Sequence, residues 1–65
     1  MTKNRKIIVA RAELALTQKD LANAVGVSRQ TIVSIEKGNY NPSLNLCKAI
    51  CKKLNKTLDE LFGEE

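Results

Sequence analysis

The chain contains no histidine and no tryptophan, and its aromatic residues are limited to Tyr40 and Phe62. Without histidine it lacks the most common metal ligand and general base. Scarce aromatic rings also remove the stacking platforms on which proteins bind single-stranded RNA. Its uninterrupted apolar runs are only a few residues long, far short of the roughly 20 needed to cross a bilayer. These absences argue against a metal site, an RNA-binding adaptor and a membrane protein.

A chain of 65 residues has room for one small core, because it buries only about 60% of its extended surface on folding. We therefore expect a single domain over residues 1–65, without space for an effector pocket. No catalytic constellation is present either. Asp59 and Glu60 are adjacent, so their side chains diverge, and no base accompanies the serines and threonines. The sequence predicts neither an enzyme nor a cofactor.

The two cysteines, Cys47 and Cys51, are four residues apart and fall on one face of a predicted helix. With no histidine and no third cysteine they cannot complete a zinc site by themselves. A disulfide within one helix would constrain little of the fold. We expect both thiols to be reduced and packed in the core, with redox sensing as the less favoured alternative.

The net charge of +4 is unevenly distributed. Residues 1–57 hold all eleven Lys and Arg side chains and only three carboxylates, which gives this part a net charge of +8. Residues 58–65 hold four carboxylates and no cation, a net charge of −4. A basic body with an acidic end favours a polyanionic partner for the body. Judged from the charge alone, ordinary solvent-exposed lysines explain this distribution as well as a polyanionic partner does.

Helix start and stop signals divide the chain into five short helices, and no segment shows the alternation of a strand. Serine or threonine precedes four of the helices as a predicted N-cap, and Gly26 and Gly38 follow two of them. The predicted helices cover residues 4–14, 18–25, 29–37, 44–54 and 58–62. The predicted fold class is therefore all-α.

Only three residues, 26–28, join the second and third predicted helices, which is typical of a helix-turn-helix. Gly26 supplies the backbone freedom for the turn, and Ala22 is small enough for a close helix crossing. If Ile32 and Ile35 face the core, the opposite side of the third helix faces solvent. That side carries Arg29, Gln30, Val33, Ser34 and Lys37.

The N-terminal end of such a helix enters the major groove when a helix-turn-helix docks on DNA. Arg29 can donate two hydrogen bonds to guanine, and Gln30 can pair with adenine. Ser34 can reach a base edge, and Val33 can contact a thymine methyl group. We predict that these four residues read bases, with a solvated helix surface as the alternative.

Several motifs occur in the order found in one family. They are residues 16–22 (LTQKDLA), 25–32 (VGVSRQTI), 35–38 (IEKG), 41–44 (NPSL) and 58–62 (LDELF). Over residues 4–62 the chain resembles the lambda repressor/Cro-like (XRE) helix-turn-helix family. The resemblance implies a five-helix repressor-type domain that binds operator DNA, usually as a dimer. It also implies a cytoplasmic protein encoded by a bacterium, an archaeon or a phage.

The resemblance places further residues at the DNA backbone. Gln18 occupies the position at which the family binds a phosphate, and a helix N-terminus favours an anion there. The expected backbone contacts are Gln18, Ser28, Thr31, Lys37, Asn39 and Tyr40. Packing of Tyr40 against the fourth helix is an equally weighted alternative. Arg11 and Glu36 match a family ion pair between the first and third helices, for which we expect a structural role.

We therefore predict a sequence-specific regulator of transcription that binds double-stranded DNA. It would act as a repressor, bound as a homodimer to a palindromic operator, and a second regulatory protein could control it. Leu58, Leu61 and Phe62 are the candidates for the dimer interface, and capping of the monomer core is the alternative for them. The alternative function is an antitoxin or another protein-interaction module with the same fold.

Overall fold

Five α-helices follow one another in the computed structural model, which describes residues 4–63. They are α1 (Arg5–Glu13), α2 (Gln18–Val25), α3 (Arg29–Lys37), α4 (Leu44–Leu54) and α5 (Leu58–Phe62). The described residues contain no strand, and the predicted all-α fold class is confirmed. The predicted bounds of the second to fifth helices agree with the structure.

The first helix is one residue shorter at each end than the predicted 4–14. Asn4 is its N-cap, because the Oδ1 atom of Asn4 accepts a hydrogen bond from the backbone N–H of Ile7 at 3.1 Å. An asparagine side chain favours this position over the helix interior. At the other end Leu14 is the C-cap, and Ala15 takes a positive φ of 54°. Alanine rarely adopts this conformation, so the sequence gives no signal for the stop.

Each of the other helices begins with a hydroxyl cap. The side chains of Thr17, Ser28, Ser43 and Thr57 all accept a hydrogen bond from the backbone N–H three residues later. At α2 and α5 the cap is reciprocal, because a carboxylate at the third helical position accepts from the N–H of the cap residue. These predicted caps are confirmed, and they explain why four helix starts could be located from sequence.

The turn between α2 and α3 depends on the conformation of Gly26, whose φ is +77°. A Cβ atom added at Gly26 would meet no other atom within 4 Å. The left-handed backbone, and not a lack of space, therefore favours glycine at this position. Ala22 is buried one turn earlier and lets the two helices cross closely.

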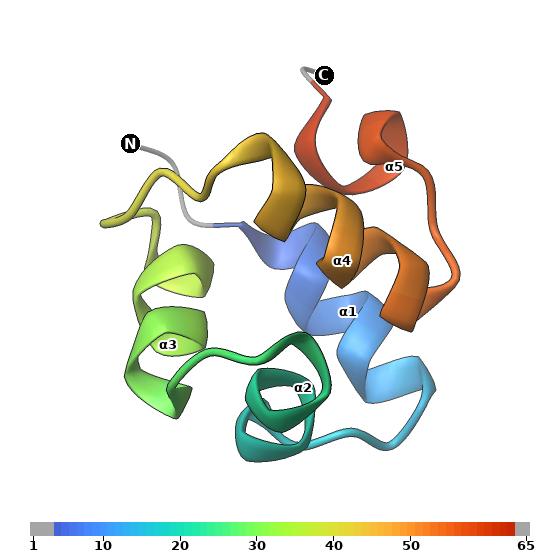
Figure 1. The fold of residues 1–65 in the computed structure, drawn as a ribbon. Helices are drawn as coiled ribbons and strands as arrows, with labels where there is room; N and C mark the ends of the chain where they lie inside the picture. The colour runs from blue at the N-terminus through green and yellow to red at the C-terminus, as the bar shows by residue number, and fades with distance from the viewer. Residues whose placement is uncertain (1–3, 64–65) are drawn as a thin grey trace.

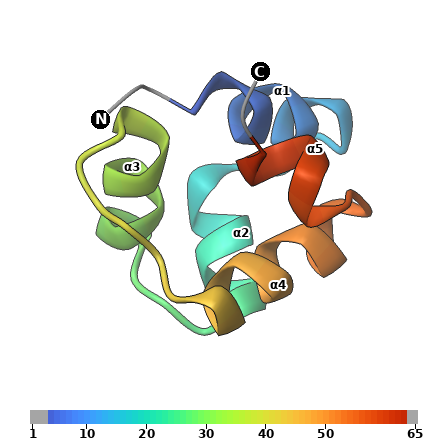
Figure 2. The ribbon, with the colours of Figure 1, turned by 90° about the horizontal axis from the view of Figure 1, so that it is seen from above.

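The helices enclose one core and leave α3 at one edge of the molecule. α2 packs on α3 and α4, whereas α5 packs on α4 and α1. In two perpendicular views α3 and α5 lie on opposite sides of the structure (Figures 1 and 2). The helix with the predicted base-reading residues is thus separated from α5, which carries Asp59 and Glu60.

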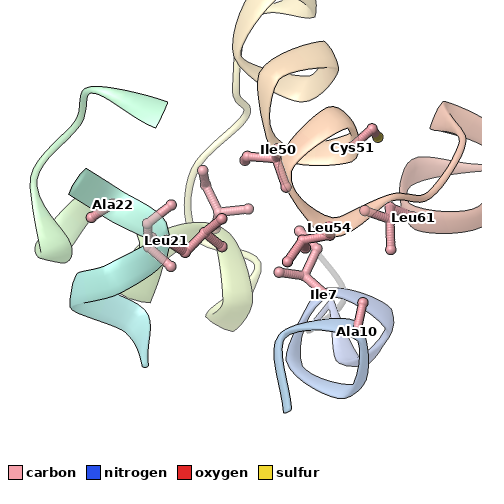
Figure 3. Packing of buried hydrophobic residues seen from close by; sticks show 10 residues of the cluster. Ile7, Ala10, Leu21, Ala22, Ile50, Cys51, Leu54 and Leu61 are labelled. Atoms are coloured by element: carbon pink, nitrogen blue, oxygen red, sulfur yellow. The ribbon is translucent and has the colours of Figure 1, made fainter. Parts of the chain in front are cut away.

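Aliphatic side chains from all five helices form the core, part of which is shown in Figure 3. Ile7, Leu21, Ile32, Ile50 and Leu54 are the largest side chains that are completely buried. Cys51 belongs to this core, as predicted, whereas Cys47 is only half-buried. Burial raises the pKa of both thiols above the usual value, which keeps them protonated and unreactive at neutral pH.

Candidate nucleic-acid interface

The outer face of α3 presents the predicted base-reading residues in two groups. Arg29 and Gln30, at the N-terminal end of the helix, are exposed. Val33 and Ser34, one turn later, are half-buried, although the sequence led us to expect them in solvent. Because Ile32 and Ile35 are buried on the inner side of α3, the predicted register of the helix is correct. The first turn of α3 is therefore its most accessible part.

An ion pair between half-buried Arg11 and buried Glu36 holds α3 against α1. The Nε atom of Arg11 donates to Oε2 of Glu36 at 2.9 Å, and its Nη2 atom donates to Oε1 at 3.3 Å. Arg11 also donates from Nη1 to the carbonyl oxygen of Leu16, at 2.9 Å. Glu36 is only 3% exposed, so its charge depends on these donors for compensation. The pair expected from the family resemblance is thus present.

Gln18 extends this ion pair to the first turn of α3. Its Nε2 atom donates to Oε1 of Glu36 at 2.9 Å, and its Oε1 atom accepts from Nη2 of Arg29 at 3.0 Å. The amide of Gln18 therefore has partners on α3 in the free protein. The sequence suggested a phosphate contact for Gln18 and gave no indication of the contact with Arg29.

These hydrogen bonds form one continuous network from Arg11 through Glu36 and Gln18 to Arg29. The network passes through the buried carboxylate of Glu36 and ends at the exposed guanidinium of Arg29. It restricts the positions that the long Arg29 side chain can take, and so reduces the entropy that a bidentate contact would cost. One guanidinium nitrogen is used by Gln18, and the remaining N–H groups are available to a ligand.

The hydroxyl groups at the start of α3 also pair with each other. Ser28 accepts a hydrogen bond from the backbone N–H of Thr31 at 3.2 Å, and the two side-chain oxygens are 3.0 Å apart. A hydroxyl group can donate once and accept twice, so each retains capacity for a further hydrogen bond. Both side chains lie next to Arg29 at the exposed end of the helix.

The residues after α3 form a second exposed segment. Lys37 is the last residue of α3, as the predicted bounds 29–37 require, and its side chain is exposed, as is that of Asn39. Gly38 ends the helix with a φ of +81°. Tyr40 is 45% exposed and is absent from the side chains that pack against the core. Of the two roles weighed for Tyr40, the structure favours a surface one.

Two features of this site gave no signal in the sequence. One is the hydrogen bond between Gln18 and Arg29, which joins two polar residues eleven positions apart. The other is Asn4, whose backbone N–H donates to the carbonyl oxygen of Glu36 at 2.9 Å and whose side chain donates to that of Leu61 at 3.0 Å. Asn4 thereby ties the C-terminal ends of α3 and α5 to the start of α1.

Comparison with known proteins identifies the family. A family model described as helix-turn-helix matches residues 7–61. The chain belongs to this helix-turn-helix family. An uncharacterised HTH-type transcriptional regulator from Archaeoglobus fulgidus is 50% identical over 52 residues, which cover 80% of this chain and 74% of that protein. The immunity repressor protein of Bacillus phage phi105 is 37% identical over 65 residues, which are 100% of this chain and 45% of the phage protein.

A solved structure supports the same assignment. The restriction-modification controller protein C.AhdI from Aeromonas hydrophila superposes with a TM-score of 0.84 and 27% identity, covering 91% of this chain and 89% of that protein. The relatives named here are regulators of transcription with a DNA-binding helix-turn-helix fold, and they are not enzymes. Among residues 4–63, no helix has the length and hydropathy needed to cross a membrane.

In this helix-turn-helix domain, the candidate dimer residues on α5 contribute to the core of the single chain. Leu61 is 3% exposed, and Leu58 and Phe62 are half-buried against the core cluster. This arrangement matches the alternative given for them, in which they cap the monomer core. Asp59 and Glu60 are exposed on the same helix, whereas Glu64 and Glu65 lie outside the described residues.

Proposed function

We propose that this chain is a sequence-specific repressor that reads the major groove of double-stranded DNA with the first turn of α3. The observation that carries the proposal is the anchored, exposed guanidinium of Arg29, held by Gln18 at 3.0 Å. An exposed arginine at the start of the second helix of a helix-turn-helix is placed to meet base edges. Because the guanidinium of Arg29 is held in place, its contact with a base would cost less entropy than the same contact made by a flexible lysine.

The side chains of this turn assign a chemical preference to the base contacts. Arg29 would donate two hydrogen bonds to the O6 and N7 atoms of guanine, and Gln30 would pair with adenine. Val33 and Ser34 are half-buried, so they would contact only bases that approach the helix closely. Each bidentate contact discriminates by about 1–3 kcal/mol against a wrong base.

The DNA backbone would be held by the residues that surround this turn. Three exposed side chains lie at or just after the C-terminal end of α3, namely Lys37, Asn39 and Tyr40. The hydroxyl groups of Ser28 and Thr31 lie at the start of the same helix. Such contacts fix the position of the helix without selecting sequence. Gln18 would contribute mainly by holding Arg29, and only secondarily by a phosphate contact.

One copy of the domain offers a single short recognition helix, which is too little surface to specify an operator. We propose that two copies bind a palindromic site, with their α3 helices about 34 Å apart on successive turns of the groove. Occupation of the operator would then block transcription. α5, which carries Asp59 and Glu60, lies on the side of the molecule away from α3 (Figures 1 and 2), where its charges would not repel DNA.

Selection from random duplex DNA at moderate salt tests this function. The expected result is a palindromic consensus with a guanine in each half-site, and the selected duplex should bind at least a hundredfold more tightly than a scrambled one. Recovery of no consensus, with equal affinity for both duplexes, would exclude operator recognition. Recovery of a single non-repeated half-site would retain base reading but reject the dimer.

A further inference from the structure

The outer face of α1 has a charge pattern that is complementary to itself. Arg5, Val9 and Glu13 are spaced four residues apart, so they lie one above the other along one side of the helix. All three are exposed, and Val9 is 56% exposed although it is a large hydrophobic residue. The face thus runs from a cation through an apolar centre to an anion.

This face is turned away from the candidate DNA interface. Successive residues of a helix are about 100° apart, so Arg11 lies on nearly the opposite side of α1 from Val9. Arg11 is the residue that contacts Glu36 of α3. Val9 therefore points away from the contact that holds α3, and a partner bound at Val9 would leave the first turn of α3 accessible.

A groove lies beside the exposed valine. It has a volume of about 290 Å³ and runs between α1 and α5, which lie next to each other in Figure 2. Val9, Ala10 and Leu61 provide its apolar lining. Lys56 and Glu60 contribute one charge of each sign to the same lining. An apolar side chain that projects from a partner would fit between these charges.

We propose that this face pairs with the same face of a second copy of the chain. The two α1 helices would run antiparallel about a two-fold axis near Val9, so that each Val9 lies at the groove of the other copy. Arg5 would then lie opposite the partner's Glu13, and Glu13 opposite the partner's Arg5. A parallel arrangement would oppose like charges at both ends, so the charge order itself selects the antiparallel one.

The charges on this face remain available within the single chain. Within residues 4–63, the one ion pair of these charges joins Oε1 of Glu13 to Nζ of Lys56 at 3.5 Å, and this exposed contact is weak. A nine-residue helix is about 14 Å long, so the shared surface is small and the free dimer should be weak. The pairing is proposed for the chain in solution, and it does not rest on the proposed function.

Charge reversal tests the pairing. Arg5→Glu places a glutamate in the first turn of α1, and Glu13→Arg places an arginine in its last turn, so both changes agree with the helix dipole and should leave the fold intact. Sedimentation equilibrium should show a weak dimer for the original chain. Each single variant should dimerise at least fivefold more weakly, because it opposes like charges in its own dimer.

Mixing the two variants gives the decisive result. An equimolar mixture of Arg5→Glu and Glu13→Arg should associate, because each variant then offers the charges that the other lacks. The double variant Arg5→Glu/Glu13→Arg should again form homodimers. Lys48→Glu, a charge reversal on the exposed side of α4, serves as the matched control and should dimerise as the original chain does. A monomeric original chain at millimolar concentration, or unchanged dimerisation of both single variants, would overturn the proposal.

Two further measurements distinguish this pairing from the proposed DNA binding and from non-specific association. Affinity for a duplex with one half-site should be the same for Glu13→Arg and the original chain to within twofold, after allowance for the added charge by a salt titration. Absence of any DNA binding by the original chain would reject the proposed function and leave the pairing intact. Val9→Cys should form an intermolecular disulfide under mild oxidation, and Lys48→Cys should not; equal crosslinking of both would contradict the two-fold axis.

Discussion

The cations of α3 and those of α4 differ in organisation more than in number. Lys48, Lys52 and Lys53 are exposed on α4, and they are three of the eleven Lys and Arg side chains in the chain. α3 carries only Arg29 and Lys37, yet Arg29 is connected through Gln18 to a buried carboxylate. Under the proposed function, the total charge would attract DNA in general, whereas the anchored side chain of Arg29 would select the sequence.

The largest expected effect comes from the base of the network. Arg11→Ala leaves the buried Glu36 without its cation and should lower the free energy of unfolding by about 3–5 kcal/mol. Lys52→Ala on α4 is the matched control, and should change it by less than about 0.5 kcal/mol. Denaturant unfolding measures both values. Equal, small losses for Arg11→Ala and for Arg11→Ala/Glu36→Ala would show that the pair is unimportant.

The next effect is on specificity. Arg29→Ala should reduce the preference for guanine at one base pair in each half-site by about 1–3 kcal/mol, while leaving other positions unchanged. Lys52→Ala should leave the preference at every position as it was. Fluorescence anisotropy with the selected duplex and single-base variants gives these differences. A uniform loss at all positions would make Arg29 a backbone contact.

A smaller effect on the guanine preference is expected from Gln18, the hydrogen-bond partner of Arg29. Gln18→Ala removes the partner of Arg29 and should weaken the same guanine preference by about 1 kcal/mol, the value of one ordinary hydrogen bond. If Gln18 instead acts only on a phosphate, affinity for all duplexes should fall alike. The same anisotropy assay distinguishes the two outcomes, because only the first is confined to one base pair.

Lys37→Ala should affect affinity without affecting sequence preference. Loss of one phosphate contact reduces the slope of log affinity against log salt by about 1. Lys48→Ala is the control, and its slope should remain that of the original chain. A change in the ranking of base variants caused by Lys37→Ala would move this lysine into the base-reading group.

The smallest effect concerns pH and the helix caps. The backbone N–H and then the hydroxyl of Thr17 hold the pKa of Asp20 below its usual value of 3.8. Because ionisation of Asp20 is favoured in the folded state, the ionised carboxylate stabilises the fold above pH 3.8. This stabilisation is lost as the pH falls through the lower pKa that Asp20 has in the folded state. Thermal unfolding between neutral pH and about pH 3 should show a shallower acid dependence for Asp20→Asn. An unchanged dependence would show that the cap does not contribute.

Caps made the helices predictable from sequence, because a cap is a local contact between residues three positions apart. Ser28 and Gly26 mark the ends of neighbouring helices in this way. The bounds of α1 were predicted less well. Its N-cap is Asn4, which the sequence analysis counted as part of the helix, and it ends before Ala15, an alanine with a positive φ. The pair of Arg11 and Glu36 was expected only from the family resemblance, because a separation of 25 residues carries no local signal.

Contacts that depend on the relative placement of helices could not be predicted. Gln18 meets Arg29 only after α2 and α3 have crossed. The sequence marked Leu61 as apolar, but packing determines that it is buried whereas Val9 is exposed. In α3 the periodic pattern placed Ile32 and Ile35 correctly in the core. It gave only the outer direction of Val33 and Ser34, which are half-buried and not fully in solvent.

Protection of guanine N7 from methylation by dimethyl sulfate tests the central claim most directly, because this atom lies in the major groove. On the selected operator, the original chain should protect one guanine in each half-site. With Arg29→Ala bound at saturation, that guanine should become reactive while the protected flanks of the site remain. Absence of protection, or protection that persists with Arg29→Ala, would contradict major-groove reading by the first turn of α3.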